Sequence, residues 1–345
     1  MSIFDLIVST QLVAYWEEMT ADRAPYMTEE LFPVEQKLGL KIDWIAGNKG
    51  TPKVLKLSAF DAKAVPRLRN KLDKLEAQMP FFKESKYIDE ELRQQLNMVI
   101  QSNNQALIDS IIMHIFDDEI SLIEGATARR ELMRMQLLTT GVVTIESNGQ
   151  AYAFDYQMPE ENKVTVDTDW SNPDADIMGD IRVLQKQILD ATGVKPTRAM
   201  CDEKTWGYIL NNNAIKKSIF VLSDGQAFVS DGRLEQYLMT ELGLKVVRNS
   251  ARYTDEDDKQ LAYMPENTFV MFPEGQLGKT FMGTTPEESD LMTQSVANVA
   301  ITEGGIAVTT MKIADPVQVE TKVTMICLPS CPHINKVGII DTKAA

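Results

Sequence analysis

The sequence predicts a mixed helix and strand (α+β) protein in which a compact α/β domain, residues 175–300, is inserted into a part made of strands and a long helix. Three observations carry this prediction. Apolar residues recur at three- and four-residue steps through residues 89–123, which indicates a long helix. An Asn-Gly pair at residues 148–149 separates two alternating runs, which indicates a hairpin. Helical and strand-like patterns alternate after residue 171.

The composition is that of a folded, globular protein. Of the 345 residues, 44% are hydrophobic and 25% are charged, which suits about two domains. The chain has no uncharged apolar run of about 18 residues, so we expect no membrane span. The N-terminal residues lack the basic start and the cleavage site of a secretory signal. Three cysteines are too few for a disulfide framework and favour a reducing compartment.

The charge is unevenly distributed along the chain. The net charge of −15 argues against a general nucleic-acid binder, which needs a basic face to displace counterions from phosphate. Residues 41–74 nevertheless hold nine Lys or Arg and only three Asp or Glu, so this basic window carries +6 and the rest of the chain −21.

The first 87 residues predict an arm followed by an extended excursion. Residues 1–40 are mixed in pattern and interrupted by prolines, which is typical of an arm. In residues 41–87 the runs LKIDWIAG and PKVLKLSAF suit strands. A lone two-stranded hairpin is marginal in water, so we expect this segment to lie on something else.

The helix predicted over residues 89–123 begins with three acids, which favour a helix N-terminus, and would be about 50 Å long. We expect Gly125 to break it, with a second helix running to Leu138. The type I′ turn at Asn148-Gly149 then places Ile145 opposite Tyr152 and Val143 opposite Phe154.

Local signals specify the elements of residues 175–300. A striped helix ends at Gly193, Asp202 caps the next helix, and a third helix ends at Gly243. Short strands are predicted at residues 198–201, 244–247 and 269–272. Residues 306–328 are strand-like again and return to the sheet of the first half.

Two stretches resemble ligand-binding motifs only in part. Residues 275–280, GQLGKT, lack the four-residue spacing between glycines and the following helix of a phosphate-binding loop, so a strand-turn-strand is the favoured interpretation. Cys327, Cys331 and His333 offer three metal ligands where a structural zinc site needs four.

Other candidate groups have ordinary structural interpretations. We interpret His114 as a core or interface residue of the long helix, and the acids 255–258 as a solvated loop. The two histidines are not set beside a nucleophile and an orienting acid. We therefore assign no catalytic, cofactor-binding or metal-binding residue, and no cofactor.

The basic window leaves three interpretations open: nucleic-acid contact, an arm lying over an acidic neighbouring copy, and a plain solvated loop. The −21 on the rest of the chain favours self-association, because opposite potentials steer association and set register. The candidate inter-subunit contacts are Lys53, Lys56, Lys63, Arg67, Arg69 and Lys71.

The order of these parts resembles a known family. An arm ending in LFP (31–33), a basic extended loop, a long helix and the stretch RRELMRMQLLTTGVVTIESNGQAYAFDY (129–156) follow one another. PENTFVMFPEG (265–275) is a weaker match. The chain is thereby similar to the lambda-like major capsid proteins of tailed phages, the phage major capsid protein E family.

This resemblance implies the Hong Kong 97-type capsid fold. Mapped onto this chain, residues 1–40 are the N-terminal arm and 41–87 the extended loop that reaches over a neighbour. Residues 88–174 and 301–345 form the peripheral domain with its spine helix, and 175–300 the axial domain. Some related capsids cross-link a loop lysine to an asparagine of another subunit. Lys63 and Lys71 stand where such a lysine would lie, and we assign no cross-link.

The implied function is that of the major head protein, which self-assembles in the host cytoplasm into the icosahedral shell of the virion. The implied partners are further copies in pentamers and hexamers, a scaffolding protein, a portal, a cementing protein and packaged double-stranded DNA without sequence-specific contact. We further expect the basic loop to dock on acids of an adjacent peripheral domain near Asp167, Asp169, Asp174 and Asp176. The rivals are an α/β enzyme using residues 175–300 and a nucleic-acid-binding protein using residues 41–74.

Overall fold

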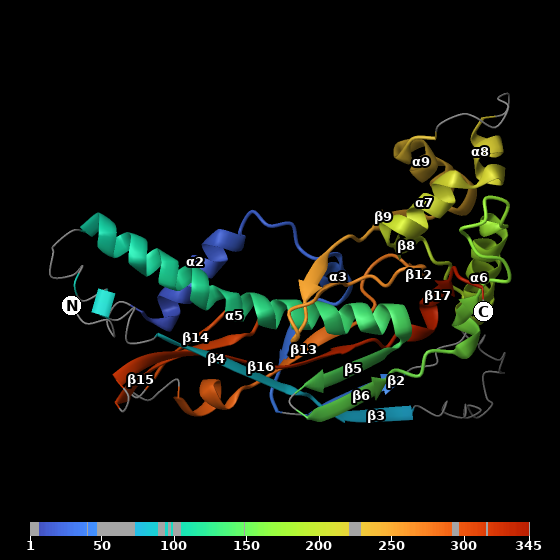
Figure 1. The fold of residues 1–345 in the computed structure, drawn as a ribbon. Helices are drawn as coiled ribbons and strands as arrows, with labels where there is room; N and C mark the ends of the chain where they lie inside the picture. Colours follow the sequence, from blue (N-terminus) through green and yellow to red (C-terminus); the bar gives the residue numbers. More distant parts are fainter. Residues whose placement is uncertain are drawn as a thin grey trace, which may run out of the picture. The chain divides into compact units, whose positions relative to one another are not determined.

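The computed structural model describes residues 7–39, 41–46, 73–88, 94–95, 98, 105–147, 149–220, 229–291, 297–314 and 317–344 (Figure 1). The chain divides into two compact units, and each is described by itself. Unit 1 comprises Met1–Ile42, Glu76–Met133 and Lys279–Ser330, and unit 2 comprises Asp43–Leu75, Arg134–Gly278 and Cys331–Ala345. No helix in the described ranges is long and apolar enough to cross a membrane.

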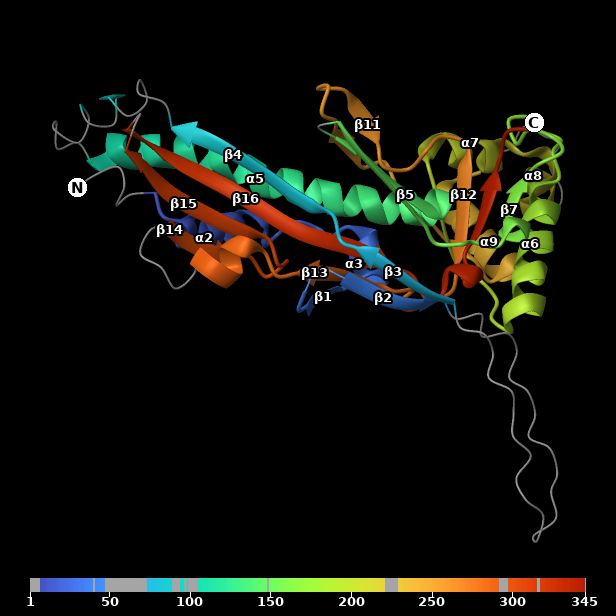
Figure 2. The same cartoon turned by 90° about the horizontal axis from the view of Figure 1, so that it is seen from below.

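Unit 1 contains a sheet organised around its longest strand, β16 (Val317–Ser330) (Figure 2). The strand order is β1-β13-β16-β15-β14, and β4 pairs with β16 outside this path. β16 is antiparallel to β4, β13 and β15, whereas β1 is parallel to β13. The remaining bounds are β1 Val34–Lys37, β4 Phe81–Ile88, β13 Lys279–Gly283, β14 Ala297–Ile301 and β15 Ala307–Ala314. The predicted return of residues 306–328 to a sheet of the first half is thus confirmed.

The N-terminal residues pack onto the sheet of unit 1. Helix α2 (Ser9–Thr20) contacts β14 and β15, and the Ser9 backbone N–H donates to Thr310 Oγ1 at 3.2 Å. After the short helix α3 (Met27–Leu31), Leu31 and Phe32 are completely buried. Since β1 follows immediately and pairs with β13, the described N-terminal residues belong to the hydrophobic core of their own chain.

A single helix, α5 (Gln105–Thr140), runs for 36 residues, or about 54 Å (Figure 1). The predicted break at Gly125 is wrong. A Cβ at Gly125 would meet no other atom within 4 Å, so this glycine faces open space. The local cost of a helical glycine, about 1 kcal/mol, is offset by buried neighbours such as Ile123 and Met133. The predicted start of this helix at residue 89 lies largely outside the described residues.

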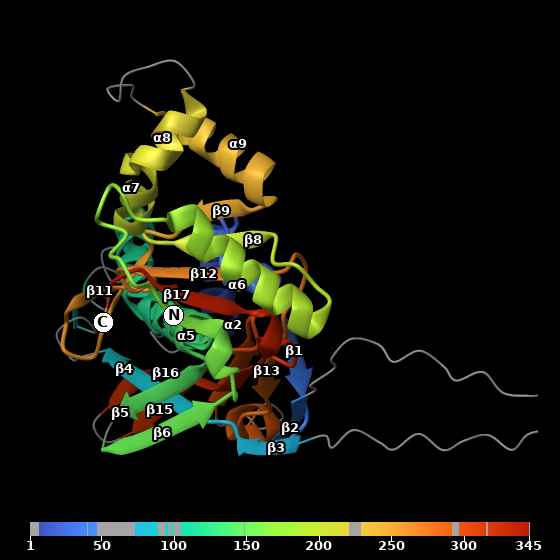
Figure 3. The ribbon, with the colours of Figure 1, turned by 90° about the vertical axis from the view of Figure 1, so that its right-hand side faces the viewer.

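Unit 2 is built on a five-stranded sheet of order β7-β17-β12-β8-β9. Its central strand β12 is antiparallel to β17 and β8, while β8–β9 and β17–β7 are parallel. Helix α6 packs over β17, as Figure 3 shows. The bounds are α6 Ile177–Thr192, α7 Glu203–Asn211, α8 Asn213–Ile219, α9 Asp231–Leu242, β7 Lys163–Thr165, β8 Arg198–Cys201, β9 Lys245–Arg248, β12 Thr268–Phe272 and β17 Gly338–Asp341.

The predicted helix signals of unit 2 are confirmed. Asp202 accepts hydrogen bonds from the backbone N–H groups of Lys204 and Thr205, which caps α7. Helices α6 and α9 end at Gly193 and Gly243, whose φ angles of 73° and 63° are left-handed. Apolar side chains of these helices and of β8, β9, β12 and β17 form one continuous core.

Two hairpins complete the fold of unit 2. The first joins β5 (Val142–Ser147) to β6 (Gln150–Asp155), with the predicted pairs Val143–Phe154 and Ile145–Tyr152 confirmed. The second joins β10 (Arg252–Thr254) to β11 (Gln260–Ala262) through the acidic run, whose residues form a turn at the surface. Short helical turns lie at Glu160–Asn162 and Ile334–Lys336 in unit 2 and at Glu287–Leu291 in unit 1. Strands β2 (Lys41–Ala46) and β3 (Asp73–Gln78), whose residues are divided between the two units, form a separate two-stranded sheet.

Candidate assembly interface

The predicted contact residues of the basic window lie outside the described residues. This holds for Lys53, Lys56, Lys63, Arg67, Arg69 and Lys71. Their expected partners are described. Asp167, Asp174 and Asp176 are exposed and Asp169 is half-buried.

The structure groups some of these acids around α6. Asp176 caps this helix by accepting from the Gly179 backbone N–H at 3.0 Å. Asp180 lies one turn further on and accepts from the Trp170 indole at 2.9 Å. Burial raises the pKa of Asp180, the bond from Trp170 opposes this, and the charges of Asp176 and Asp167 raise the pKa further. These three aspartates therefore share one negative field, which a cationic partner would relieve.

Asp169 and Asp174 have other partners. The Asp174 carboxylate accepts from the Asn213 side chain at 2.8 Å, and Asp169 accepts from the backbone N–H of Ala344. Sequence reasoning missed Asp180, whose position one helical turn after the Asp176 cap was the available signal.

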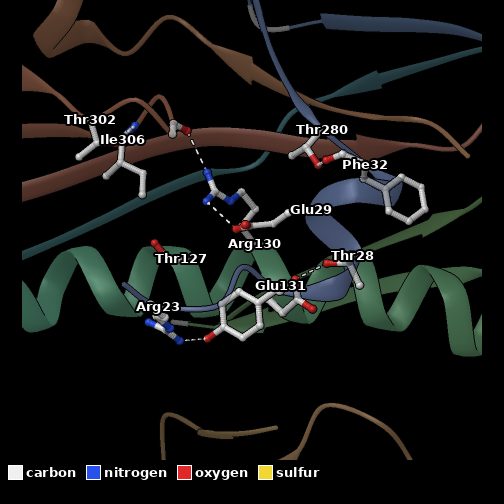
Figure 4. Close-up of polar contacts among 12 residues, drawn as sticks. Arg23, Thr28, Glu29, Phe32, Thr127, Arg130, Glu131, Thr280, Thr302 and Ile306 are labelled. Atoms are coloured by element: carbon white, nitrogen blue, oxygen red, sulfur yellow. Dashed lines mark hydrogen bonds and ion pairs between the residues drawn. The ribbon is translucent and has the colours of Figure 1, made fainter. Parts of the chain in front are cut away.

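A buried charge cluster in unit 1 was also missed. Thr28, Glu29, Arg130, Glu131 and Gly304 form it, and we call it the Arg130 cluster (Figure 4). The Arg130 guanidinium donates to the Gly304 carbonyl at 2.9 Å and lies 3.7 Å from the Glu29 carboxylate. The Thr28 hydroxyl donates to the Glu131 carboxylate, whose side chain is almost wholly buried. The cluster thus joins α3, α5 and the β14–β15 turn.

Two further carboxyl groups are buried against β16 in unit 1. Lys322 lies 2.7 Å from Glu287, with both side chains less than a tenth exposed. Burial raises the pKa of Glu287, but the hydrogen bond from Lys322, a backbone hydrogen bond and the charge of Lys322 together outweigh it and hold that pKa below its usual range.

Glu119 lies on α5, and burial raises its pKa to about 7. The nearby Thr321 hydroxyl and the charge of Lys86 lower the pKa, whereas the charge of Asp118 raises it. Its Oε2 atom has no hydrogen-bond partner among the described residues.

The remaining sequence motifs take structural roles. Cys201, Cys327 and Cys331 are buried, free thiols, and in the described part of the chain no three His, Cys, Asp or Glu residues gather as metal ligands. The GQLGKT stretch leads into strand β13 instead of a helix, so the strand-turn-strand interpretation is confirmed. His114 is exposed on α5, so its interpretation as a core residue is wrong, and an interface role stays a prediction.

Comparisons with known proteins agree with this architecture. The sequence matches the family model of the phage major capsid protein E over residues 9–339. A candidate prophage capsid protein of Escherichia coli CFT073 has a similar fold, with a TM-score of 0.58 at 15% identity over 97% of this chain and 99% of that chain. A phage-related protein of Bordetella bronchiseptica RB50 gives 0.56 at 12% identity over 97% of each chain.

The capsid of cyanophage A-1(L) gives a TM-score of 0.53 at 10% identity over 92% of each chain. Among curated proteins, none matches the sequence. At these identities the structural likenesses show the fold alone, which is the mixed helix and sheet fold of phage capsid proteins. The family match shows in addition to which family the chain belongs. The chain belongs to the phage major capsid protein E family, and its function is to form the protein shell of a phage virion.

Proposed function

We propose that this chain is the major head protein of a tailed phage, arranged as pentamers and hexamers in an icosahedral shell around double-stranded DNA. Residues 1–40 are the N-terminal arm, 41–87 the extended loop, 88–174 with 301–345 the peripheral domain, and 175–300 the axial domain. The observation that carries the proposal is the family match over residues 9–339, which spans nearly the whole chain.

The extended loop supports this assignment. Strands β2 and β3 form a two-stranded sheet without a third strand among the described residues. Such a sheet gains too little burial to be stable alone in water. A neighbouring subunit supplies the missing surface, so the loop completes its folding only in the shell. Segments that extend over a neighbouring subunit in this way form interfaces of about 2,000 Å² or more.

The loop docks through opposite charges. Its basic side chains Lys63, Arg67 and Arg69 lie against the negative field of Asp167, Asp176 and Asp180 on a neighbouring copy. The support is the raised pKa of Asp180, which is caused mainly by burial and to which the charges of Asp176 and Asp167 add. A cation placed there lowers that pKa again and gains binding free energy in doing so.

The remaining partners follow from the shell. A scaffolding protein, a portal and a cementing protein act on the subunit in the host cytoplasm, and the DNA makes no sequence-specific contact. A net charge of −15 suits a container of DNA, because a basic lining would hold the genome on the wall. The subunit has no enzymatic role, and the alternative of an α/β enzyme finds no support in the comparisons.

Electron microscopy of the assembled protein tests the proposal. The chain is co-expressed with the scaffolding protein of its own phage, purified by sedimentation and imaged in negative stain. We expect closed particles with fivefold and sixfold clusters. Small soluble oligomers under all conditions, together with turnover of a small molecule, would refute the proposal.

A further inference from the structure

The outer edge of strand β6 carries unpaired backbone groups. The backbone N–H of Tyr156 donates to the Gly141 carbonyl at 3.1 Å. In an antiparallel ladder hydrogen-bonded and non-bonded pairs alternate, so Phe154 and Tyr152 also bond to β5. The N–H and C=O groups of Ala151, Ala153 and Asp155 must therefore point away from β5. Among the described residues the hairpin has no third strand.

This edge has few of the usual protections against pairing with another chain. Residues 150–154, QAYAF, contain no proline, lysine or other charge. Every residue of β6 except Phe154 is exposed, with 45% of the Tyr152 surface accessible. Figure 1 shows β6 beside β5 in the hairpin. An exposed edge with free donors and acceptors, whose one charged residue, Asp155, stands at its end, is a template for adding a strand.

We infer that the outer edge of β6 is a strand-addition site for the basic window of a second copy of this chain. The inference rests on the proposed function, since it needs copies that assemble. The added strand bonds the outward groups of Ala151, Ala153 and Asp155 and converts the hairpin into a three-stranded sheet.

The negative charge of the hairpin favours the basic window, and not the β6 strand of a second copy, as the added strand. The hairpin, residues 142–155, contains Glu146 and Asp155 and no Lys or Arg. At the turn, Glu256 adds a further carboxylate by accepting from the Ser147 hydroxyl at 3.0 Å. Two such hairpins repel each other, whereas the basic window carries +6 and includes PKVLKLSAF, a run that suits a strand.

Hydrogen exchange tests the backbone part of the inference. Site-resolved exchange is measured by mass spectrometry on unassembled subunits and on closed particles. We expect the amides of Ala151, Ala153 and Asp155 to exchange at least about tenfold more slowly in particles. The amides of Tyr152 and Phe154 bond to β5 in both states and serve as internal references. Unchanged exchange of the three outward amides in well-formed particles overturns the inference.

Charge variants test the identity of the occupant. Ala153→Lys sets a cation against the basic window, and we expect the particle yield to fall about tenfold or more. Ala153→Glu introduces a side chain similar in size to that of Ala153→Lys but of opposite charge, so we expect the particle yield to stay the same or to rise. Ala191 is an exposed alanine of α6, so Ala191→Lys and Ala191→Glu are matched controls that leave the yield unchanged. Equal losses with Ala153→Lys and Ala153→Glu contradict a basic occupant.

Cross-linking distinguishes the remaining occupants. All three native thiols are buried, so a chain with Ala153→Cys and Lys56→Cys adds one thiol on β6 and one in the basic window. We expect a disulfide between copies that needs both substitutions. A bridge formed by Ala153→Cys alone places another β6 there and overturns the inference. If the wild type never forms particles, the proposed function itself fails, whereas particles without this bridge refute only the β6 site.

Discussion

At the scale of single residues, Glu119 makes the stability of unit 1 depend on pH. Burial raises its folded pKa to about 7, above the ordinary value of 4.5. The folded state therefore holds a proton that the unfolded state releases. The stability gained in this way is complete below pH 4.5 and is lost as the pH rises through 7.

We expect Glu119→Gln to raise the unfolding free energy at pH 8 by up to about 3 kcal/mol, with little change at pH 4.5. The amide keeps a polar group of nearly the same size and removes the buried charge. Urea titrations of the unassembled subunit at the two pH values measure the effect. Glu124→Gln, at an exposed position of the same helix, is the control. An equal gain at both pH values would show that the charge of Glu119 is not the cause.

Arg130 is the second residue on which unit 1 depends. Its guanidinium is nearly buried and has two fixed partners, Gly304 and Glu29. Arg130→Ala leaves the Gly304 carbonyl without its donor and a cavity behind, so we expect a loss of about 2 to 3 kcal/mol. The change also exposes residues 7–37 to protease, because the cluster holds α3.

Arg182→Ala removes an exposed ion pair with Glu241 and is the control, with an expected loss under about 1 kcal/mol. Comparable losses for both variants would contradict the role of burial.

At the scale of elements, the features that depend on residues close in sequence were predicted correctly more often than those that depend on distant residues. The β5–β6 register, the Asp202 cap and the ends at Gly193 and Gly243 were all predicted, because each depends on residues close in sequence. The break at Gly125 was wrong, because packing on both sides outweighs one unfavourable residue. The Arg130 cluster was beyond prediction, since it joins positions up to 276 residues apart, from Thr28 to Gly304.

Two glycines that looked alike in the sequence should respond oppositely to alanine. Gly125→Ala adds a methyl group in open space within α5 and improves helix propensity, so we expect a gain of about 0.5 to 1 kcal/mol. Gly243→Ala forces a left-handed φ on a residue with a Cβ, so we expect a loss of about 1 to 2 kcal/mol. Denaturation midpoints of the two variants measure both effects. A loss on substituting Gly125 would mean that α5 needs a break there after all.

At the scale of the whole molecule, the position of charge should matter more than its total. The triple variant Lys63→Glu, Arg67→Glu and Arg69→Glu lowers the net charge by six, from −15 to −21, and removes the attraction between the loop and its neighbour. Changing the exposed Lys186, Lys217 and Lys245 to Glu gives the same −21 and keeps the basic window intact. Both variants should fold as subunits, as circular dichroism checks. Particle yields are then compared by sedimentation across a range of salt concentrations.

We expect the loop variant to lose assembly at low and moderate salt and the control to assemble, because the two differ only in where the charge lies. At about 1 M salt the Debye length falls to about 3 Å, so the repulsion of the loop variant is screened and part of its yield returns. Contacts made by apolar groups and backbone remain in both proteins at that salt. If the loop variant assembles normally at low salt, the charges of residues 41–74 do not hold the shell together. If both variants fail equally, the total charge governs assembly and the loop has no special part in it.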